Sequence, residues 1–228
     1  MAPRNPDGLI RFGMLALPLA GSLALAGLYS AFKLGSGGIL ATGDNRAIVS
    51  TGYFASVFLG DVLALTVLIF GIVALYAYLA ETAQRTLALG ATVSTLVGIS
   101  LMLSRLGVFA YAVPALSASF LDGDPESITI LDHVFAGPLG LVEIASDLLY
   151  SAGFVLFGAA IWRSGVLPRL AGVLVAVHAP LITGPAPVAG AAAGALLALL
   201  GGGWIALSAI RGGPGSDRIK SRARTRSA

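Results

Sequence analysis

The sequence predicts an all-α fold, a polytopic membrane bundle of six transmembrane helices with both termini in the cytoplasm. Of its 228 residues, 57% are hydrophobic and only 11% are charged, whereas roughly a quarter of the residues are charged in a typical soluble domain. The apolar residues gather in six runs, and about 20 consecutive apolar residues are enough for a helix to cross a bilayer. The composition therefore excludes a sizeable soluble domain.

The apolar runs divide the chain into one membrane domain, residues 1–211, and a tail, residues 212–228. The spans are expected at about residues 12–32, 53–79, 87–113, 135–162, 170–184 and 188–210. A cleavable signal peptide is the alternative for the first run, which is longer than the roughly 7 to 15 residues of such a peptide's apolar core. The tail is basic and contains Gly and Ser, which predicts a disordered cytoplasmic segment.

Turn-forming and helix-breaking residues mark the ends of several spans. Gly43-Asp44-Asn45 is a turn signal within the first loop, residues 33–50. Pro114 is a natural stop for the third span, and residues 115–134 are expected to form an acidic loop after it. The fifth span contains Pro180 and is followed by two further prolines, so its last turn is expected to be broken and covered by protein or water.

The orientation follows from the short loops that hold Lys and Arg, because such loops stay in the cytoplasm. One side of the expected bundle collects eleven basic residues, and the other side holds only Lys33 and Arg46. Both termini are therefore expected inside and the acidic loop outside. Arginine outnumbers lysine twelve to two and Ala, Leu and Gly are abundant, which favours a GC-rich bacterial genome and a place in the bacterial plasma membrane.

Five ionisable side chains fall inside the expected spans: Asp61, Arg105, Glu143, Asp147 and His178. Counted from the expected outer ends of their spans, Asp61, Arg105 and Glu143 each lie 8 residues deep, which is about 12 Å along a helix. Three helices therefore place charge in one layer. Arg105 is the natural partner of the carboxylates, because a guanidinium stays protonated and can hold a carboxylate through two hydrogen bonds.

The fourth span carries a polar stripe, because Glu143, Ser146, Asp147 and Tyr150 follow the i, i+3, i+4, i+7 spacing of one helix face. A charged side chain at the middle of a bilayer costs about 2.5 to 3.5 kcal/mol, so this stripe is expected to face the interior of the bundle. One arginine cannot neutralise the three carboxylates in the spans. We therefore expect one or two of them to be protonated near neutral pH, or balanced by His178, water or a bound cation.

Two further patterns concern the helix arrangement. A shift of 82 positions places Asp61 on Glu143 and Gly71 on Gly153, which indicates either a parallel duplication of two-helix units or a chance alignment. In the sixth span, Gly190 and Gly194 have the spacing of a close helix contact. This span is therefore also a candidate interface for a homo- or hetero-oligomer.

The segment Gly153-Phe154-Val155-Leu156-Phe157-Gly158, followed by Trp162-Arg163 and then Leu167-Pro168-Arg169-Leu170-Ala171-Gly172, resembles a hairpin of uncharacterised bacterial six-span integral membrane proteins. That resemblance covers about a fifth of the chain. It implies six helices and no particular activity. The signatures of rhodopsins, haem-copper oxidases and intramembrane proteases are absent from the sequence.

Three classes of function remain open. The leading hypothesis is a protein that binds or transports a proton, a cation or a small polar or cationic solute through Asp61, Arg105, Glu143 and Asp147, with Tyr150 or His178 as a proton relay. The second is an intramembrane enzyme, such as a terpene cyclase, in which Glu143 and Asp147 protonate a prenyl or lipid substrate. The third is a structural or accessory subunit, in which the charges serve assembly.

No metal or cofactor is expected. The chain has no cysteine and two histidines, which excludes disulfides and thiolate metal sites and argues against a histidine-rich metal centre. The expected partner is the lipid bilayer, and the basic tail is expected to contact anionic headgroups, where each Lys or Arg contributes about 1 kcal/mol. Nucleic-acid binding is not expected of so short a tail.

Overall fold

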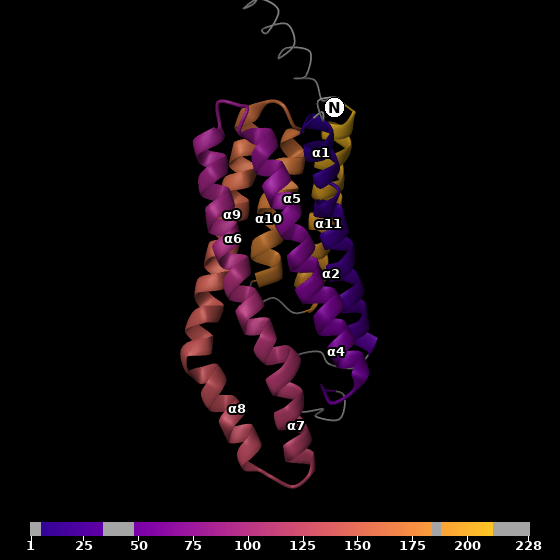
Figure 1. Ribbon diagram of the computed structural model, residues 1–228, viewed down its shortest axis with the longest axis vertical. Coiled ribbons are helices and arrows are strands. Elements are labelled where there is room, and N and C mark those ends of the chain that lie inside the picture. The colour runs from indigo at the N-terminus through magenta and orange to yellow at the C-terminus, as the bar shows by residue number, and fades with distance from the viewer. Residues whose placement is uncertain (1–5, 34–47, 184–187, 212–228) are drawn as a thin grey trace, which may run out of the picture.

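The computed structural model describes residues 6–33, 48–183 and 188–211, and every regular element in these ranges is a helix (Figure 1). The elements are α1 (Pro6–Gly13), α2 (Ala16–Lys33), α4 (Thr51–Val57), η1 (Phe58–Val62), α5 (Leu63–Leu79), α6 (Arg85–Gly107), η2 (Val108–Ala112), α7 (Val113–Leu121), α8 (Glu126–Ala136), α9 (Pro138–Ser164), α10 (Arg169–Thr183) and α11 (Val188–Ile210). The expected all-α class is confirmed. Most of the first loop, the two prolines after α10 and the tail lie outside the described residues.

Five helical stretches are long and apolar enough to cross a membrane. They are Gly8–Leu28, Gly52–Leu79, Arg85–Leu121, Pro138–Ser164 and Ala189–Ile210. The fifth expected span is apolar but short, because α10 has only 15 residues. At 1.5 Å per residue this is about 22 Å, less than the roughly 30 Å of a hydrocarbon core. The described part of the chain therefore supports five membrane-spanning helices, and the expected count of six is not confirmed.

Six helices close a ring. Each of α2, α5, α6, α9, α10 and α11 packs against the next one along the chain, and α11 packs back against α2. Helices that are not neighbours in the ring have few backbone approaches to one another, and side chains fill the space between them where they meet. The backbones of the ring therefore leave room for side chains along its axis.

The molecule has two different ends (Figure 1). At one end, α7 and α8 extend beyond the ring as a helical hairpin, and we call this the hairpin end. The opposite end contains α1 and the last turn of α11, and we call it the terminal end. Connections at the terminal end carry five of the described arginines: Arg11, Arg85, Arg163, Arg169 and Arg211.

The region expected to be an acidic loop, residues 115–134, is instead almost entirely helical. The third span does not stop at Pro114, because the helix runs on through α7 to Leu121. A proline removes one backbone N–H from the helical ladder, and the π-helical turn η2 lies directly before it. The changed hydrogen-bond register of a π-helical turn accommodates that missing donor without ending the helix.

The α7–α8 turn is held by one carboxylate. Asp124 accepts hydrogen bonds from the hydroxyls of Ser127 at 2.9 Å and Ser119 at 3.1 Å, and from the backbone N–H of Glu126 at 3.1 Å. These bonds lower the pKa of Asp124 from its ordinary value, the one to Ser127 most strongly. Gly123 has φ +100°, which a residue with a side chain rarely adopts.

Glycines bring neighbouring helices into backbone contact. A Cβ added at Gly98 would lie 2.6 Å from the backbone nitrogen of Tyr150, and one at Gly153 would lie 2.7 Å from that of Thr95, so α6 and α9 have no space between them there. Gly71 likewise faces Leu17 of α2. The two glycines of the aligned repeat, Gly71 and Gly153, thus each face the preceding helix of the ring, while the repeat itself stays a prediction.

The glycines of α11 also pack within the chain. Gly194 faces His178 and Ile182 of α10, whereas Gly202 faces Leu17 and Pro18 of α2. The close helix contact expected at Gly194 is therefore present, and its partner is the helix that precedes it in this chain. An oligomer through this helix remains a prediction.

The half of the ring near the terminal end is filled with side chains. Ile72, Leu75 and Leu79 of α5 meet Phe157 and Ile161 of α9 in one core, and each is at most 1% exposed. Large apolar side chains on the outside of the ring remain uncovered, for example Leu141, Ile144 and Leu148 on α9, at 60 to 72% exposed. The ring is therefore closed at its terminal half and presents an apolar surface suited to lipid.

We predict that Gly153→Ala destabilises the protein, because the new methyl group would force α6 and α9 apart. Overpacking of this kind costs about 1 to 3 kcal/mol. The matched control is Gly90→Ala in α6, where an added Cβ meets nothing within 4 Å and where helix propensity favours Ala by about 0.5 to 1 kcal/mol. Thermal unfolding of both variants in detergent should show a loss for the first and none for the second.

We predict that acid loosens the α7–α8 turn. Because the pKa of Asp124 is lowered in the folded protein, its carboxylate stabilises the turn fully above the unfolded pKa of about 4. This stabilisation is lost as the pH falls through the lower, folded pKa. Hydrogen exchange of the first turn of α8, corrected for the intrinsic rate, should therefore stay constant from neutral pH down to about pH 5 and increase as the pH falls below about 4. Asp124→Ala should produce the same increase already at neutral pH, and Asp122→Ala, two residues earlier in the turn, should leave the exchange unchanged.

Candidate functional site

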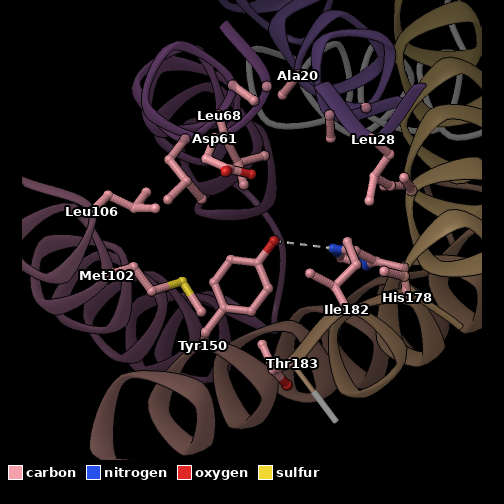
Figure 2. Close-up of a pocket in the computed structure, with 18 of the residues that line it drawn as sticks. Ala20, Leu28, Asp61, Leu68, Met102, Leu106, Tyr150, His178, Ile182 and Thr183 are labelled. Atoms are coloured by element: carbon pink, nitrogen blue, oxygen red, sulfur yellow. Dashed lines mark hydrogen bonds between the residues drawn. The ribbon is translucent and has the colours of Figure 1, made fainter. Parts of the chain in front are cut away.

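A cavity of about 400 Å³ lies inside the ring. It occupies the half toward the hairpin end, and the packed core described above forms its floor. Residues of α2, η1, α5, α6, α9, α10 and α11 line it, and most of them are apolar. The apolar lining includes Leu17, Ala20, Ala24, Leu28, Leu68, Met102, Ile182, Ala191 and Ala195. Figure 2 shows several of these side chains around the cavity.

The six side chains singled out from the sequence all line this one cavity. They are Asp61 on η1, Arg105 on α6, Glu143, Asp147 and Tyr150 on α9, and His178 on α10. The polar stripe of α9 thus faces inward as expected, with Ser146 fully buried beside it. Residues 117 positions apart in the chain, from Asp61 to His178, meet around one space.

Arg105 is the only Lys or Arg among the described residues that line the cavity. Its Nη1 lies 2.7 Å from Oε1 of Glu143 and 4.0 Å from Oδ1 of Asp147. The expected ion pair with Glu143 is therefore present. The two expected hydrogen bonds are not present, because Nε and Nη1 of Arg105 are both buried without a hydrogen-bond partner among the described residues, and the contact of Nη1 with Glu143 is an ion pair only.

An aromatic ring covers the arginine. The guanidinium carbon of Arg105 lies 6.0 Å from the ring centroid of Phe109, one helical turn further on. At this distance the ring attracts the cation. Phe109 was not predicted as part of the site. The signal in the sequence that indicates it is an aromatic residue four positions after a buried arginine.

Asp61 has no cation or hydrogen-bond donor in contact among the described residues, although it lines the same cavity as Arg105. Its carboxylate is accessible from the cavity. Figure 2 shows it at the same cavity as the hydroxyl of Tyr150. Asp61 is therefore the carboxylate that is left without a partner in contact among the described residues.

Close contacts fix the backbone that carries Asp61. The preceding residue, Gly60, touches Gly27 of α2 so closely that neither position has room for a side chain. Ser56 donates a hydrogen bond of 2.9 Å to the carbonyl of the same Gly27. Asp61 itself lies in the π-helical turn η1. Such turns are frequent at functional sites, since they re-aim the side chains that follow.

Tyr150 and His178 form a buried pair deeper in the cavity. Their side chains are each 3% exposed, and the hydroxyl of Tyr150 lies 3.4 Å from Nε2 of His178 (Figure 2). Nδ1 of His178 is hydrogen-bonded to the carbonyl of Val175. The ring of Phe154 packs edge-on against the imidazole, with 4.4 Å between centroids. The pair is thus held in place from three sides.

Comparisons with protein-family models, with curated protein sequences and with solved structures gave no match for this chain. The arguments for function therefore rest on the cavity and its side chains.

We predict that Arg105→Gln destabilises the protein more than Glu143→Gln does. The first change leaves three carboxylates around the cavity without a cation, whereas after the second change Asp147, already 4.0 Å from Nη1, still faces Arg105. Removing one partner of a fully buried pair costs about 3 to 5 kcal/mol. The side chain of Glu143 is 45% exposed, so we expect about 1 to 3 kcal/mol for Arg105→Gln. Thermal unfolding in detergent at neutral pH measures both, and equal losses would contradict the prediction.

Proposed function

We propose that this protein is a six-span integral membrane protein that binds a small organic cation in the cavity. The observation that carries the proposal is the unpaired carboxylate of Asp61 in a largely apolar cavity whose only described Lys or Arg, Arg105, already faces two other carboxylates. If all three carboxylates are ionised, the cavity has a net charge of about −2, which a cation would balance.

The size and lining of the cavity favour an organic cation over a proton or a metal ion. Ligand pockets of small molecules have volumes of roughly 300 to 1,000 Å³ and are mostly apolar with a few placed polar groups. The cavity, at about 400 Å³, falls in this range. Among the described residues, no three acidic or histidine side chains converge as they would around a metal ion. A cation with an apolar body matches both the charge and the walls.

The arrangement of charge supports an outward-facing cavity. The connections at the terminal end carry Arg11, Arg85, Arg163, Arg169 and Arg211, and loops with this excess stay in the cytoplasm. In this orientation the hairpin end and the cavity face outward, both termini are cytoplasmic, and α10 is a shortened fifth span. The bacterial plasma membrane is the proposed location.

Transport is an extension of this proposal. The terminal half of the ring is filled by Ile72, Leu75, Leu79, Phe157 and Ile161, so a bound cation has no way through in this conformation. Release to the cytoplasm would require these side chains to separate. Binding from outside is therefore the activity that the geometry supports best.

An intramembrane enzyme is the second candidate. The observation in its favour is that apolar walls adjoin Asp147 and Tyr150, as a prenyl or lipid substrate would require. A carboxylic acid at Glu143 or Asp147 would donate the proton. The two candidates differ in a simple way, because an enzyme of this kind converts a neutral lipophilic substrate, whereas the proposed binding protein prefers a cation to its neutral isostere.

We predict that benzyltrimethylammonium binds to the purified protein in detergent, and that neopentylbenzene, its neutral isostere, binds at least about tenfold more weakly, which corresponds to 1.4 kcal/mol. Asp61→Asn should weaken binding of the cation by about tenfold and leave that of the neutral isostere unchanged. Isothermal titration calorimetry or a thermal shift series measures these affinities.

The control for this experiment is Asp122→Asn, which makes the same change at the exposed α7–α8 turn, away from the cavity. It should bind benzyltrimethylammonium as the unmodified protein does. Equal affinity for the two isosteres would refute the proposal and favour the enzyme or an accessory subunit, in which the charges serve only assembly.

A further inference from the structure

The polar pair at the inner end of the cavity has a defined hydrogen-bond direction. The carbonyl oxygen of Val175 can only accept, so Nδ1 of His178 must carry the proton of their hydrogen bond. No described carboxylate contacts His178, and a buried imidazolium without a counterion is costly. The ring is therefore neutral and its Nε2 is an acceptor.

The hydroxyl of Tyr150 must then be the donor in its bond with Nε2 of His178. A phenolic hydroxyl has one proton, and this bond uses it. The oxygen keeps its lone pairs, and Figure 2 shows that the hydroxyl points into the cavity. What the pair presents to a ligand is thus a hydrogen-bond acceptor with no proton to donate.

The other polar groups near this acceptor reinforce the same preference. Asp61 lines the same cavity as Tyr150 and, when ionised, it too can only accept hydrogen bonds (Figure 2). The hydroxyl of Thr183, which also lines the cavity, is 3.1 Å from the carbonyl of Ala179 and 2.9 Å from the hydroxyl of Ser151. Its proton is therefore directed to a neighbour within the chain.

We infer that the cavity selects a protonated amine, whose N–H group donates to the hydroxyl oxygen of Tyr150, over a quaternary ammonium ion of the same shape. This inference rests on the proposed function and names the ligand class, an ammonium ion with at least one N–H and a compact apolar body. The carboxylate of Asp61 attracts the positive charge of the ligand, the hydroxyl oxygen of Tyr150 accepts a hydrogen bond from its N–H group, and the apolar residues contact its apolar body.

His178 acts here as a positioning residue. It touches the cavity, but its effect on the ligand runs through the hydroxyl of Tyr150, whose only proton it holds. Val175 and the edge of the Phe154 ring keep the imidazole in that orientation. A site that hydrogen-bonds its ligand rejects the analogue that lacks the hydrogen-bonding group, because a buried polar atom is then left unpaired.

The test compares benzyltrimethylammonium with protonated N,N-dimethylbenzylamine, which differs by one methyl group and has one N–H. Titrations of the unmodified protein in detergent at pH 7 should give an affinity for the tertiary ammonium at least about tenfold higher. In Tyr150→Phe, which keeps the ring, this preference should fall to less than about threefold, while the affinity for the quaternary ion stays the same. The matched control is Tyr111→Phe, since Tyr111 lies outside the cavity and is 67% exposed.

The outcomes separate the two proposals. If benzyltrimethylammonium binds no more tightly than neopentylbenzene, the proposed function fails. If both cations bind but the quaternary ion binds as tightly as the tertiary one, the inference on ligand class is overturned and the proposed function stands. An unchanged N–H preference in Tyr150→Phe would also overturn the role of Tyr150. The ligand comparison needs only the unmodified protein, so it decides even if the variant does not fold.

Discussion

Backbone contact at glycine is the constraint on which the structure depends. Within a membrane, helices gain little from hydrophobic burial against one another, so close packing of small residues has to hold them together. Gly98 and Gly153 remove all space between α6 and α9, and Gly202 does the same between α11 and α2. These contacts close the ring at its wall, where side chains are small. The space inside the ring forms the cavity in the half toward the hairpin end, and side chains fill it as a packed core in the half toward the terminal end.

The charges of the cavity follow from this arrangement. A lipid-facing carboxylate is costly, and the ring offers the interior as the one place where Asp61, Glu143 and Asp147 escape the hydrocarbon. Arg105 then contacts only the two acids of α9, Glu143 at 2.7 Å and Asp147 at 4.0 Å, and its single positive charge can balance one of them. The third carboxylate, that of Asp61, is out of contact with Arg105. Its lack of a partner is a consequence of geometry that a count of charges along the chain does not show.

Much of the site could be predicted from sequence because buried charge in an apolar run has few places to go. The i, i+3, i+4, i+7 spacing from Glu143 to Tyr150 fixed one face of α9, and the need to shield that face brought Arg105 and Asp61 to the same space. What could not be predicted depends on tertiary packing. That Asp61 lies out of contact with Arg105 follows from the tight α6–α9 contact, which places the guanidinium beside Glu143.

The fold shows the same division. Apolar periodicity located the long helices, but the rule that a proline ends a helix failed at Pro114, because η2 changes the hydrogen-bond register just before it. The charged and turn-forming residues after Pro114 predict a loop. Instead, the carboxylate of Asp124 accepts hydrogen bonds from Glu126 and Ser127 in the first turn of α8 and so stabilises the start of that helix. The apolar composition of residues 170–184 predicts a span, but α10 has only 15 residues and is shorter than the five candidate spans.

The contact between Gly27 and Gly60 has a consequence for the entropy of binding. Asp61 follows Gly60 directly, and the backbone of Gly60 touches that of Gly27 in α2 with no side chain between them. Ser56 of α4 adds a hydrogen bond to the carbonyl of the same Gly27. The carboxylate of Asp61 is therefore attached to a backbone that is already fixed before a ligand binds. Ordering a loose site upon binding would consume part of the interaction energy. Here that ordering is completed during folding, so a small ligand with few contacts can still be held.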